Sequence, residues 1–511
     1  MDLGLRWKLY GDGTAPPPGE VVRPQERLSW GRTAGLGAQH VVAMFGATFV
    51  FPVLMGLDPN LAIMMSGVAT ILFLLVVQGR IPSYLGSSAS FVAAAAVVSP
   101  GGANPAVLTG AVCVAGVVLA LSGFVIHLLG PRAVLAAFPP AVTGAVVMLI
   151  GFNLAPVVAD SYWPFDQWTG LLTMAFVILA TVLLRGFLGR VTILLGLVFG
   201  FALSWAADLL LGPAALPEGG TAPRVDLADV AAAPWIGLPE FHAPQFETSA
   251  VLVVLPAVIA LIAENAGHVK AVQEMTGEDL DRYMGRAIIA DGVATSLSSA
   301  VGGPPTTTYA ENIGVMAATR VYSTAAYYVA ALAAVLVGLC PKFGALVAAT
   351  PAGVLGGITV VLYGMIGLLG AKIWVENRVD FGNPIVLVPV AAGLIAGIGG
   401  VRLEITGTFA IEGIALGTLI TLVGYHALAR LAPAAMRPAP APAGPLDHEH
   451  TDADSGAGLL LGSGVDAMAP EDPADGQGRP AASGAPEEPA DPRAGGARGT
   501  GGRPGGGAAE G

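Results

Sequence analysis

The stretch from Leu252 to Val272 reads LVVLPAVIALIAENAGHVKAV, a largely apolar run that contains an acid, Glu264, and an imidazole, His268. A charged side chain at the centre of a bilayer costs about 2.5–3.5 kcal/mol on insertion scales, so an ionisable group in such a run indicates a functional site. Because the two residues are four apart, they share one face of a helix. A second acid, Glu311, lies in a similarly apolar setting. Together the three groups predict a polar substrate or a proton pathway.

The composition is that of a polytopic membrane protein. Hydrophobic residues make up 54% of the 511 residues and charged residues only 12%, whereas soluble domains carry about 25% charged residues. Apolar segments of about 20 residues can each cross a hydrocarbon core of about 30 Å, and we predict about fourteen of them. They start near Ala34, Leu61, Ile81, Ala106, Ala141, Gln167, Val191, Ser249, Arg286, Pro304, Thr324, Ala352, Pro384 and Phe409.

The basic residues support this count, because cytoplasmic loops are enriched in Lys and Arg. With the N-terminus inside, fourteen spans leave only Arg224, Lys342 and Arg402 outside, among 24 basic residues in the chain. We therefore expect both termini in the cytoplasm, with residues 1–33 as an N-terminal cytoplasmic segment that contains no removable signal peptide. The net charge of −12 and the lack of a basic patch argue against a nucleic-acid partner.

The C-terminal segment differs from the rest of the chain. From residue 433 to residue 511 the sequence is rich in Ala, Pro, Gly, Asp and Glu and poor in aromatic residues. Such a segment cannot bury enough apolar area to offset its ordering entropy. It predicts a disordered cytoplasmic tail.

Two of the expected spans are interrupted, and they correspond to each other. The third contains the segment Ser83–Phe91 (SYLGSSASF), and the tenth contains Pro305–Glu311 (PTTTYAE). Their separation of about 220 residues matches the offset between the first and eighth spans, and seven spans per half place the second half upside down relative to the first. This is the inverted-repeat plan of secondary transporters.

Each interruption predicts a short strand that leads into a half-helix. Three β-branched residues, Thr306 to Thr308, follow two prolines and favour an extended backbone, and Gly86 to Ser88 is equally poor as helix interior. Non-helical backbone at this depth must lie inside protein or beside a water-filled cavity. A half-helix that starts near Ala310 would point unpaired N–H groups at the midplane, where they suit a substrate carbonyl or an anion.

Other interpretations remain open at this stage. Glu264 and His268 can tie helices together, or coordinate zinc in a membrane-embedded hydrolase, although no H-E-x-x-H arrangement is present. A channel is a third alternative. Interhelical hydrogen bonding and a functional role fit equally well for Gln39, His40, Asp291 and Glu412.

Several motifs resemble those of the nucleobase-ascorbate transporters, and most closely those of the bacterial uracil permeases. Residues 311–320, ENIGVMAATR, resemble the family motif of an acid or amide, Asn, any residue, Gly, four variable residues, Thr and a basic residue. Gln39-His40, Tyr84–Ser88 and Ala263–His268 agree with further family segments. The resemblance covers residues 25–432 or so.

The resemblance implies an all-α polytopic membrane protein with fourteen spans in a seven-plus-seven inverted repeat and short antiparallel strands in spans 3 and 10. Within a transporter region of residues 34–432, a core domain would comprise residues 34–130 and 248–341. A gate domain would comprise residues 131–247 and 342–432. Substrate would bind between the two domains, and a homodimer is a possible assembly.

The resemblance also implies roles for individual residues. Glu264 and Glu311 would accept hydrogen bonds from substrate ring N–H groups, His268 would assist through water or in proton coupling, and backbone N–H groups of Ala89 and Ala310 would donate to ring carbonyls. Phe and Gly are usual where this chain has Ala89 and Ala310, which leaves the pocket shape open. Tyr309 would join the substrate site, with Gln39, His40, Asn312, Ser87 and Ser88 as supporting polar residues.

Uracil complements such a site, because its neutral ring carries two N–H donors and two carbonyl acceptors. The membrane potential does not drive a neutral substrate, so coupling requires an ion, and buried Glu or His can bind and release a proton. We therefore expect a carrier, not an enzyme, that performs proton-coupled uptake of uracil or a close pyrimidine analogue across the inner membrane by alternating access. It would need no metal or cofactor. A xanthine or purine permease is the alternative.

Overall fold

The computed structural model describes residues 5–17, 20–99, 102–130, 136–185, 188–189, 192–215, 220–255, 257–406, 409–433 and 436. The tail predicted from residue 433 onward lies outside these residues, apart from positions 433 and 436. Eight described helices are long and apolar enough to cross a membrane, and the number rises to nine if α16 (Thr324–Gly338) and α17 (Pro341–Ala348), which meet at a bend of 83°, form one span. The protein is thus a mostly helical membrane protein.

The membrane region follows the expected order of segments. Its first half comprises α1 (Trp30–Leu54), α2 (Pro59–Val76), β3 (Leu85–Ser87) with η1 (Ala89–Phe91) and α3 (Val92–Val98), α4 (Pro105–Leu129), α6 (Pro140–Phe152), α7 (Ala155–Ser161), α8 (Gln167–Leu183) and α10 (Thr192–Leu211). Its second half comprises α12 (Thr248–Val254), α13 (Ala257–Thr276), α14 (Met284–Ala300), β6 (Thr306–Thr308), α15 (Ala310–Thr319), α16, α17, α18 (Ala352–Glu376), α19 (Pro384–Ile398) and α20 (Gly413–Leu431). Each of the fourteen expected segments begins within a few residues of one of these elements or of the hairpin before α20. How many of them cross the membrane stays a prediction.

Short elements connect or precede these helices. They are β1 (Lys8–Leu9), β2 (Glu26–Arg27), β4 (Ala214–Ala215), β5 (Thr221–Ala222), α11 (Ala228–Ala232), η3 (Asp281–Tyr283), β7 (Arg402–Thr406) and β8 (Phe409–Glu412). Strands β1 and β2 pair in parallel, and β4 with β5 and β7 with β8 pair antiparallel.

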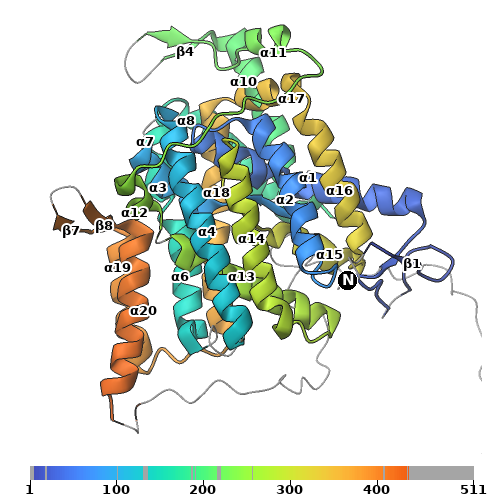
Figure 1. Cartoon of the computed structure of the whole chain (residues 1–511). Helices are drawn as coiled ribbons and strands as arrows, with labels where there is room; N and C mark the ends of the chain where they lie inside the picture. Colours follow the sequence, from blue (N-terminus) through green and yellow to red (C-terminus); the bar gives the residue numbers. More distant parts are fainter. Residues whose placement is uncertain are drawn as a thin grey trace, which may run out of the picture. The chain divides into compact units, whose positions relative to one another are not determined.

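The helices pack in pairs that join the two halves of the sequence. Helix α4 lies along α14, α2 lies along α16, and α6 lies along α18; the α4–α14 pair runs side by side through the middle of Figure 1. Within each half, α8 packs on α10, and α19 packs on α20. These contacts interleave the two halves rather than leaving them as separate lobes.

Close backbone approach at glycines makes the α6–α18 crossing tight. A Cβ atom built at Gly370 would collide with the carbonyl oxygen of Gly144, and one built at Gly151 would collide with the backbone of Gly367. Small residues at helix crossings are typical of membrane proteins, where association relies on close van der Waals packing rather than on the hydrophobic effect.

The two predicted strands pair in the middle of this helical framework, as expected. Strands β3 and β6 are antiparallel, with Leu85 opposite Thr308 and Ser87 opposite Thr306. The ladder extends beyond both ends, because Ser88 N donates to Pro305 O over 2.9 Å, and Tyr309 N donates to Tyr84 O over 2.9 Å. Every residue of the two strands is buried.

The start of the last expected span was predicted wrongly. Residues Phe409–Glu412 form strand β8 rather than helix, and they pair with β7. Helix α20 begins at Gly413, whose φ of 58° is a left-handed conformation that glycine adopts without steric cost. The β-branched residues Ile405, Thr406 and Ile411 favour the extended backbone of this hairpin.

An ion-pair network anchors the connection between α10 and α12. Arg224, one of the three basic residues expected outside, places its Nε 2.6 Å from Asp166 Oδ2 and its Nη1 3.0 Å from Asp208 Oδ1. Asp166 also caps α8 by accepting hydrogen bonds from Thr169. Burial raises the pKa of Asp166, but the hydrogen bonds from Thr169 and Arg224 outweigh burial and hold that pKa below its ordinary value.

The tight α6–α18 crossing predicts a specific effect of a single methyl group. We expect Gly370→Ala to separate the two helices, at a cost of about 1–3 kcal/mol for overpacking, and to lower the melting temperature of the purified protein by several degrees. Gly364→Ala, on the same helix, is the matched control because a Cβ there meets no atom within 4 Å. Equal melting temperatures for the two variants would contradict the predicted crossing.

Candidate functional site

The expected site residues meet where α13 faces the paired strands. His268, on α13, places its Nδ1 2.6 Å from Thr308 Oγ1 of β6. Glu264, one turn earlier, lies within electrostatic range of Asp291 and Glu311. The structure therefore brings the two acids and the imidazole to one region, as their positions in the sequence predicted.

Asp291 connects three elements behind this region. Its Oδ2 accepts a hydrogen bond of 2.7 Å from Asn265 Nδ2 on α13, and its Oδ1 accepts one of 3.1 Å from Thr306 Oγ1 on β6. The Asp291 side chain is fully buried. Of the two interpretations left open for Asp291, the geometry matches interhelical hydrogen bonding, which fixes β6 against α13 and α14.

A second network fixes the orientation of α15. Asn312 Nδ2 donates to the carbonyl oxygen of His40 on α1 over 3.0 Å and lies 3.2 Å from His40 Nδ1. Tyr327 OH, on α16, donates to Asn312 O over 3.2 Å, and its ring lies 4.2 Å from the imidazole ring of His40. Asn312 and His40 thus lie at the junction of α1, α15 and α16, and their role in supporting a site stays a prediction.

Two polar residues of uncertain role lie outside these networks. Gln39 is only partly buried, and its side chain makes no hydrogen bond to any residue in the described part of the chain. Glu412 belongs to the β7–β8 hairpin, where it pairs with Arg402 in the strand register. The structure does not bring either residue together with Glu264 and Glu311.

Tyr309 locks the end of β3 against β6. Its hydroxyl donates to Ser87 O over 2.9 Å and accepts from Thr48 Oγ1 over 3.2 Å. The ring lies directly over Gly86, where an added Cβ would collide with it. The hydroxyl is thus engaged on both sides, and the side chain of Tyr309 is buried.

Both strands end at the start of a helix. Ala310 is the first residue of α15, and its capping residue Tyr309 makes no side-chain hydrogen bond to the first turn. Ala89 is the first residue of η1, where Ser88 Oγ accepts from Ser90 N over 3.3 Å. The first backbone N–H groups of a helix lack intrahelical partners, so the two chain segments present donors near the strand ends.

Accessibility separates the site residues into two groups. Glu264, His268, Ala310 and Glu311 are partly exposed. The residues that support them are buried: Ser87, Ser88, Asn265, Asp291, Thr306, Thr307, Thr308 and Asn312. The partly exposed group is therefore the set that a ligand can reach.

The sequence contains a repeat that the motif analysis missed. Gly67–Thr70 of α2 and Gly292–Thr295 of α14 both read GVAT, preceded by Ser66 in one copy and by Asp291 in the other. Both threonine hydroxyls bind the backbone of a strand: Thr70 that of β3, and Thr295 that of β6. A search for identical short segments separated like the two interrupted spans would have found this pair.

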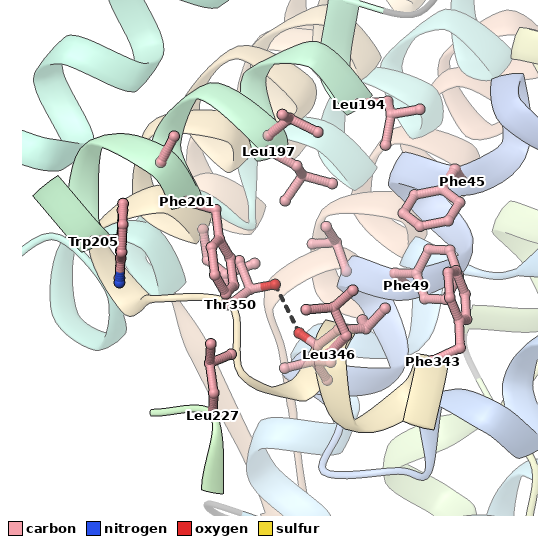
Figure 2. Close-up of a pocket in the computed structure, with 16 residues that line it drawn as sticks. Phe45, Phe49, Leu194, Leu197, Phe201, Trp205, Leu227, Phe343, Leu346 and Thr350 are labelled. Atoms are coloured by element: carbon pink, nitrogen blue, oxygen red, sulfur yellow. Dashed lines mark hydrogen bonds between the residues drawn. The ribbon is translucent and has the colours of Figure 1, made fainter. Parts of the chain in front are cut away.

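A separate apolar cavity lies between α1, α10, α17 and α18, and Figure 2 shows the side chains that line it. Its volume is about 480 Å³, and it is lined by aromatic and aliphatic residues such as Phe45, Phe49 and Trp205. Thr350 donates its hydroxyl hydrogen to Val347 O over 2.7 Å, as the dashed line in Figure 2 indicates. With no ionisable lining residue, this cavity lacks the groups that would recognise a polar ring.

Known proteins resemble the chain over most of its length. A model described as the Permease family matches residues 31–406. The chain is 45% identical over 419 residues to RutG of Escherichia coli (strain K12), whose assignment as a pyrimidine permease is provisional, and the match covers 81% of this chain and 92% of RutG. It is 36% identical over 416 residues to the uracil permease of Bacillus caldolyticus, covering 78% of this chain and 93% of that protein.

A solved structure shares the fold. The murine anion transporter Slc26a9 in its inward-facing state superimposes with a TM-score of 0.59 at 11% identity, over 79% of this chain and 69% of that chain. At this identity the likeness concerns architecture alone, and it places the chain among membrane transporter folds.

The contact between Gly86 and Tyr309 predicts coupled effects of substitution. Gly86→Ala should displace the Tyr309 ring and destabilise the protein by about 1–3 kcal/mol, and Tyr309→Ala alone should also destabilise it because a buried ring is lost. In the double variant the ring is absent, so the added methyl group should cost little, and the two losses should not add. Thermal unfolding of the four proteins tests this, and strictly additive losses would contradict the contact.

Proposed function

The chain belongs to the nucleobase-ascorbate transporter family, and on that premise we propose that it takes up uracil or a close pyrimidine analogue by proton-coupled alternating access. It is a transporter and not an enzyme, as are the permeases it matches. The observation that carries the proposal is the meeting of Glu264, Ala310 and Glu311, all partly exposed, beside two buried strands.

The chemistry of the site supports a pyrimidine substrate. An ionised carboxylate only accepts hydrogen bonds, so Glu264 and Glu311 suit the two ring N–H groups of uracil. The backbone N–H groups of Ala310 and Ala89 suit its two carbonyl oxygens. A site that pairs every polar group of a ligand rejects ligands that leave buried groups unpaired.

Coupling to protons follows from the charge of the substrate. Uracil is neutral, so a cotransported ion must supply the driving force, and Glu264, His268 and Glu311 are the titratable groups of the accessible set. The hydrogen bond between His268 and Thr308 supports a role for His268 in linking protonation to the position of β6. Uptake would take place across the inner cell membrane, with both termini in the cytoplasm.

The packing supports the proposed architecture of fourteen spans in a seven-plus-seven inverted repeat. If each helix is replaced by its counterpart in the other half, the packed pair α4–α14 becomes the packed pair α16–α2, and α8–α10 becomes α19–α20. The packed pair α6–α18 becomes itself, because α6 and α18 are each other's counterparts. We assign residues 34–130 and 248–341 to a core domain. Residues 131–247 and 342–432 form the gate domain, through which a homodimer would assemble.

The proposed function is tested by uptake into proteoliposomes. Labelled uracil should accumulate when a proton gradient is imposed, should not require sodium, and should cease with a protonophore. Glu264→Gln should weaken uracil binding by at least about tenfold. The two carboxylate oxygens both accept hydrogen bonds, whereas the amide replaces one of them with a donor that cannot pair with a ring N–H. Glu404→Gln is the control, since Glu404 lies in the exposed β7–β8 hairpin.

Two results would contradict this proposal. Uptake that persists with a protonophore but vanishes without sodium would show that sodium, and not the proton, is the coupling ion. Xanthine displacing label better than uracil or thymine would make the protein a purine permease on the same scaffold.

Glu311 provides a test of selectivity. A carboxylate offers acceptors alone, whereas the amide of Glu311→Gln offers a donor and an acceptor at nearly the same size. We expect the variant to bind uracil more than about tenfold more weakly, or about 1.4 kcal/mol, and to improve xanthine relative to uracil. The measurement is the affinity of both ligands on both proteins. If the ratio of the uracil and xanthine affinities is the same in both proteins, Glu311 acts in coupling or structure. Ala89 is then the next position to test for selectivity.

A further inference from the structure

One threonine hydroxyl contacts the outer edge of each site strand at the first residue of that strand. Thr70 Oγ1, on α2, lies 2.9 Å from Leu85 N and 3.3 Å from Leu85 O. Thr295 Oγ1, on α14, lies 3.1 Å from both Thr306 N and Thr306 O. Leu85 and Thr306 are the first residues of β3 and β6, so the two backbone contacts correspond; Thr295 Oγ1 lies in addition 3.0 Å from Thr306 Oγ1.

A hydroxyl is suited to this position because it can donate and accept at once. A two-stranded sheet leaves the outer edge of each strand without a partner strand, and water is not available to replace it where the residues are buried. Both threonines have no exposed surface. Each hydroxyl therefore satisfies the N–H and the carbonyl group of one strand residue that would otherwise both be unpaired.

The two contacts belong to the repeated GVAT segments. Gly67 and Gly292 begin these segments, and a Cβ at either would collide with the backbone of the packed partner helix, at Ala331 O of α16 or at Ala120 N of α4. Each threonine is thus carried by a helix that is itself held by close backbone contact. Each GVAT segment thus supplies two features: a glycine that allows close helix packing, and a threonine three residues later that binds the strand.

We propose that Thr70 and Thr295 are matched positioning residues, which hold β3 and β6 in the register that aims the first turns of η1 and α15 at the substrate. Few residues separate each contact from its helix start: Leu85 is four residues before Ala89, and Thr306 is four before Ala310. A strand released from its outer contact shifts the N–H donors of that start. The inference rests on the proposed function for its ligand, but the structural role of the two hydroxyls does not.

Substitutions that remove only the hydroxyl test the role. Thr70→Val and Thr295→Val keep the side-chain volume, and Thr70→Ser and Thr295→Ser keep the hydroxyl. Thr359→Val is the matched control, because Thr359 is also fully buried and its hydroxyl donates only to Leu355 O and Gly356 O within α18. The measurements are uracil affinity by calorimetry, melting temperature, and amide hydrogen exchange of peptides that cover residues 84–91 and 305–312.

Each valine variant should weaken uracil binding by about tenfold or more and raise exchange in both strand peptides, because the antiparallel ladder couples them. The serine variants should bind within about threefold of wild type, and Thr359→Val should change neither affinity nor strand exchange at a comparable change in melting temperature. Valine variants with wild-type affinity and wild-type exchange would overturn the proposal. If wild-type protein fails to bind uracil, the proposed function fails, and strand exchange still decides whether the hydroxyls hold the strands.

Discussion

The structure depends on satisfying the backbone polar groups of two short non-helical segments inside a membrane domain. Lipid offers no hydrogen bonds, so extended backbone at this depth is tolerated only when protein or enclosed water pairs it. Strands β3 and β6 satisfy each other along their inner edges, and threonines from α2 and α14 bind the first residue of each strand at its outer edge. The helices that carry those threonines must then be packed closely, which the glycine contacts with α16 and α4 achieve.

This pairing makes the ends of the strands available for ligands. The strands are buried, and the polar groups left partly exposed are those of Ala310 and Glu311 at the start of α15 and of Glu264 and His268 on α13. Asp291 and Asn312 do not face that space; their hydrogen bonds run to Thr306, Asn265 and His40 and keep the elements in place. Hydrogen bonds between buried polar groups of this kind rigidify a site.

Local sequence signals were enough to predict the strands and to place Glu264 beside Glu311, because prolines, β-branched residues and isolated charges act over a few residues. Contacts between distant segments were harder to foresee. Nothing near Thr70 in the sequence indicates that its hydroxyl binds Leu85, and the partly exposed Gln39 lies beside the buried His40 without joining its network. The hairpin before α20 was missed because its apolar residues also fit a membrane span, and only the paired geometry separates the two. Roles in binding and coupling stay predictions.

The two GVAT segments are alike, but the residues that precede them differ in chemistry. Ser66 and Asp291 each precede a GVAT segment; Ser66 Oγ lies 3.0 Å from Tyr84 OH, whereas Asp291 accepts hydrogen bonds from Thr306 and Asn265. Many secondary transporters are built from two related halves, but the proposed pyrimidine has no two-fold symmetry. A symmetric framework can therefore hold both strands in the same way while the acids gather in one half. The glycine and threonine of both GVAT segments maintain the framework. Asp291, at the position that Ser66 occupies in the first half, allows the second half to fix β6 in front of Glu264 and His268.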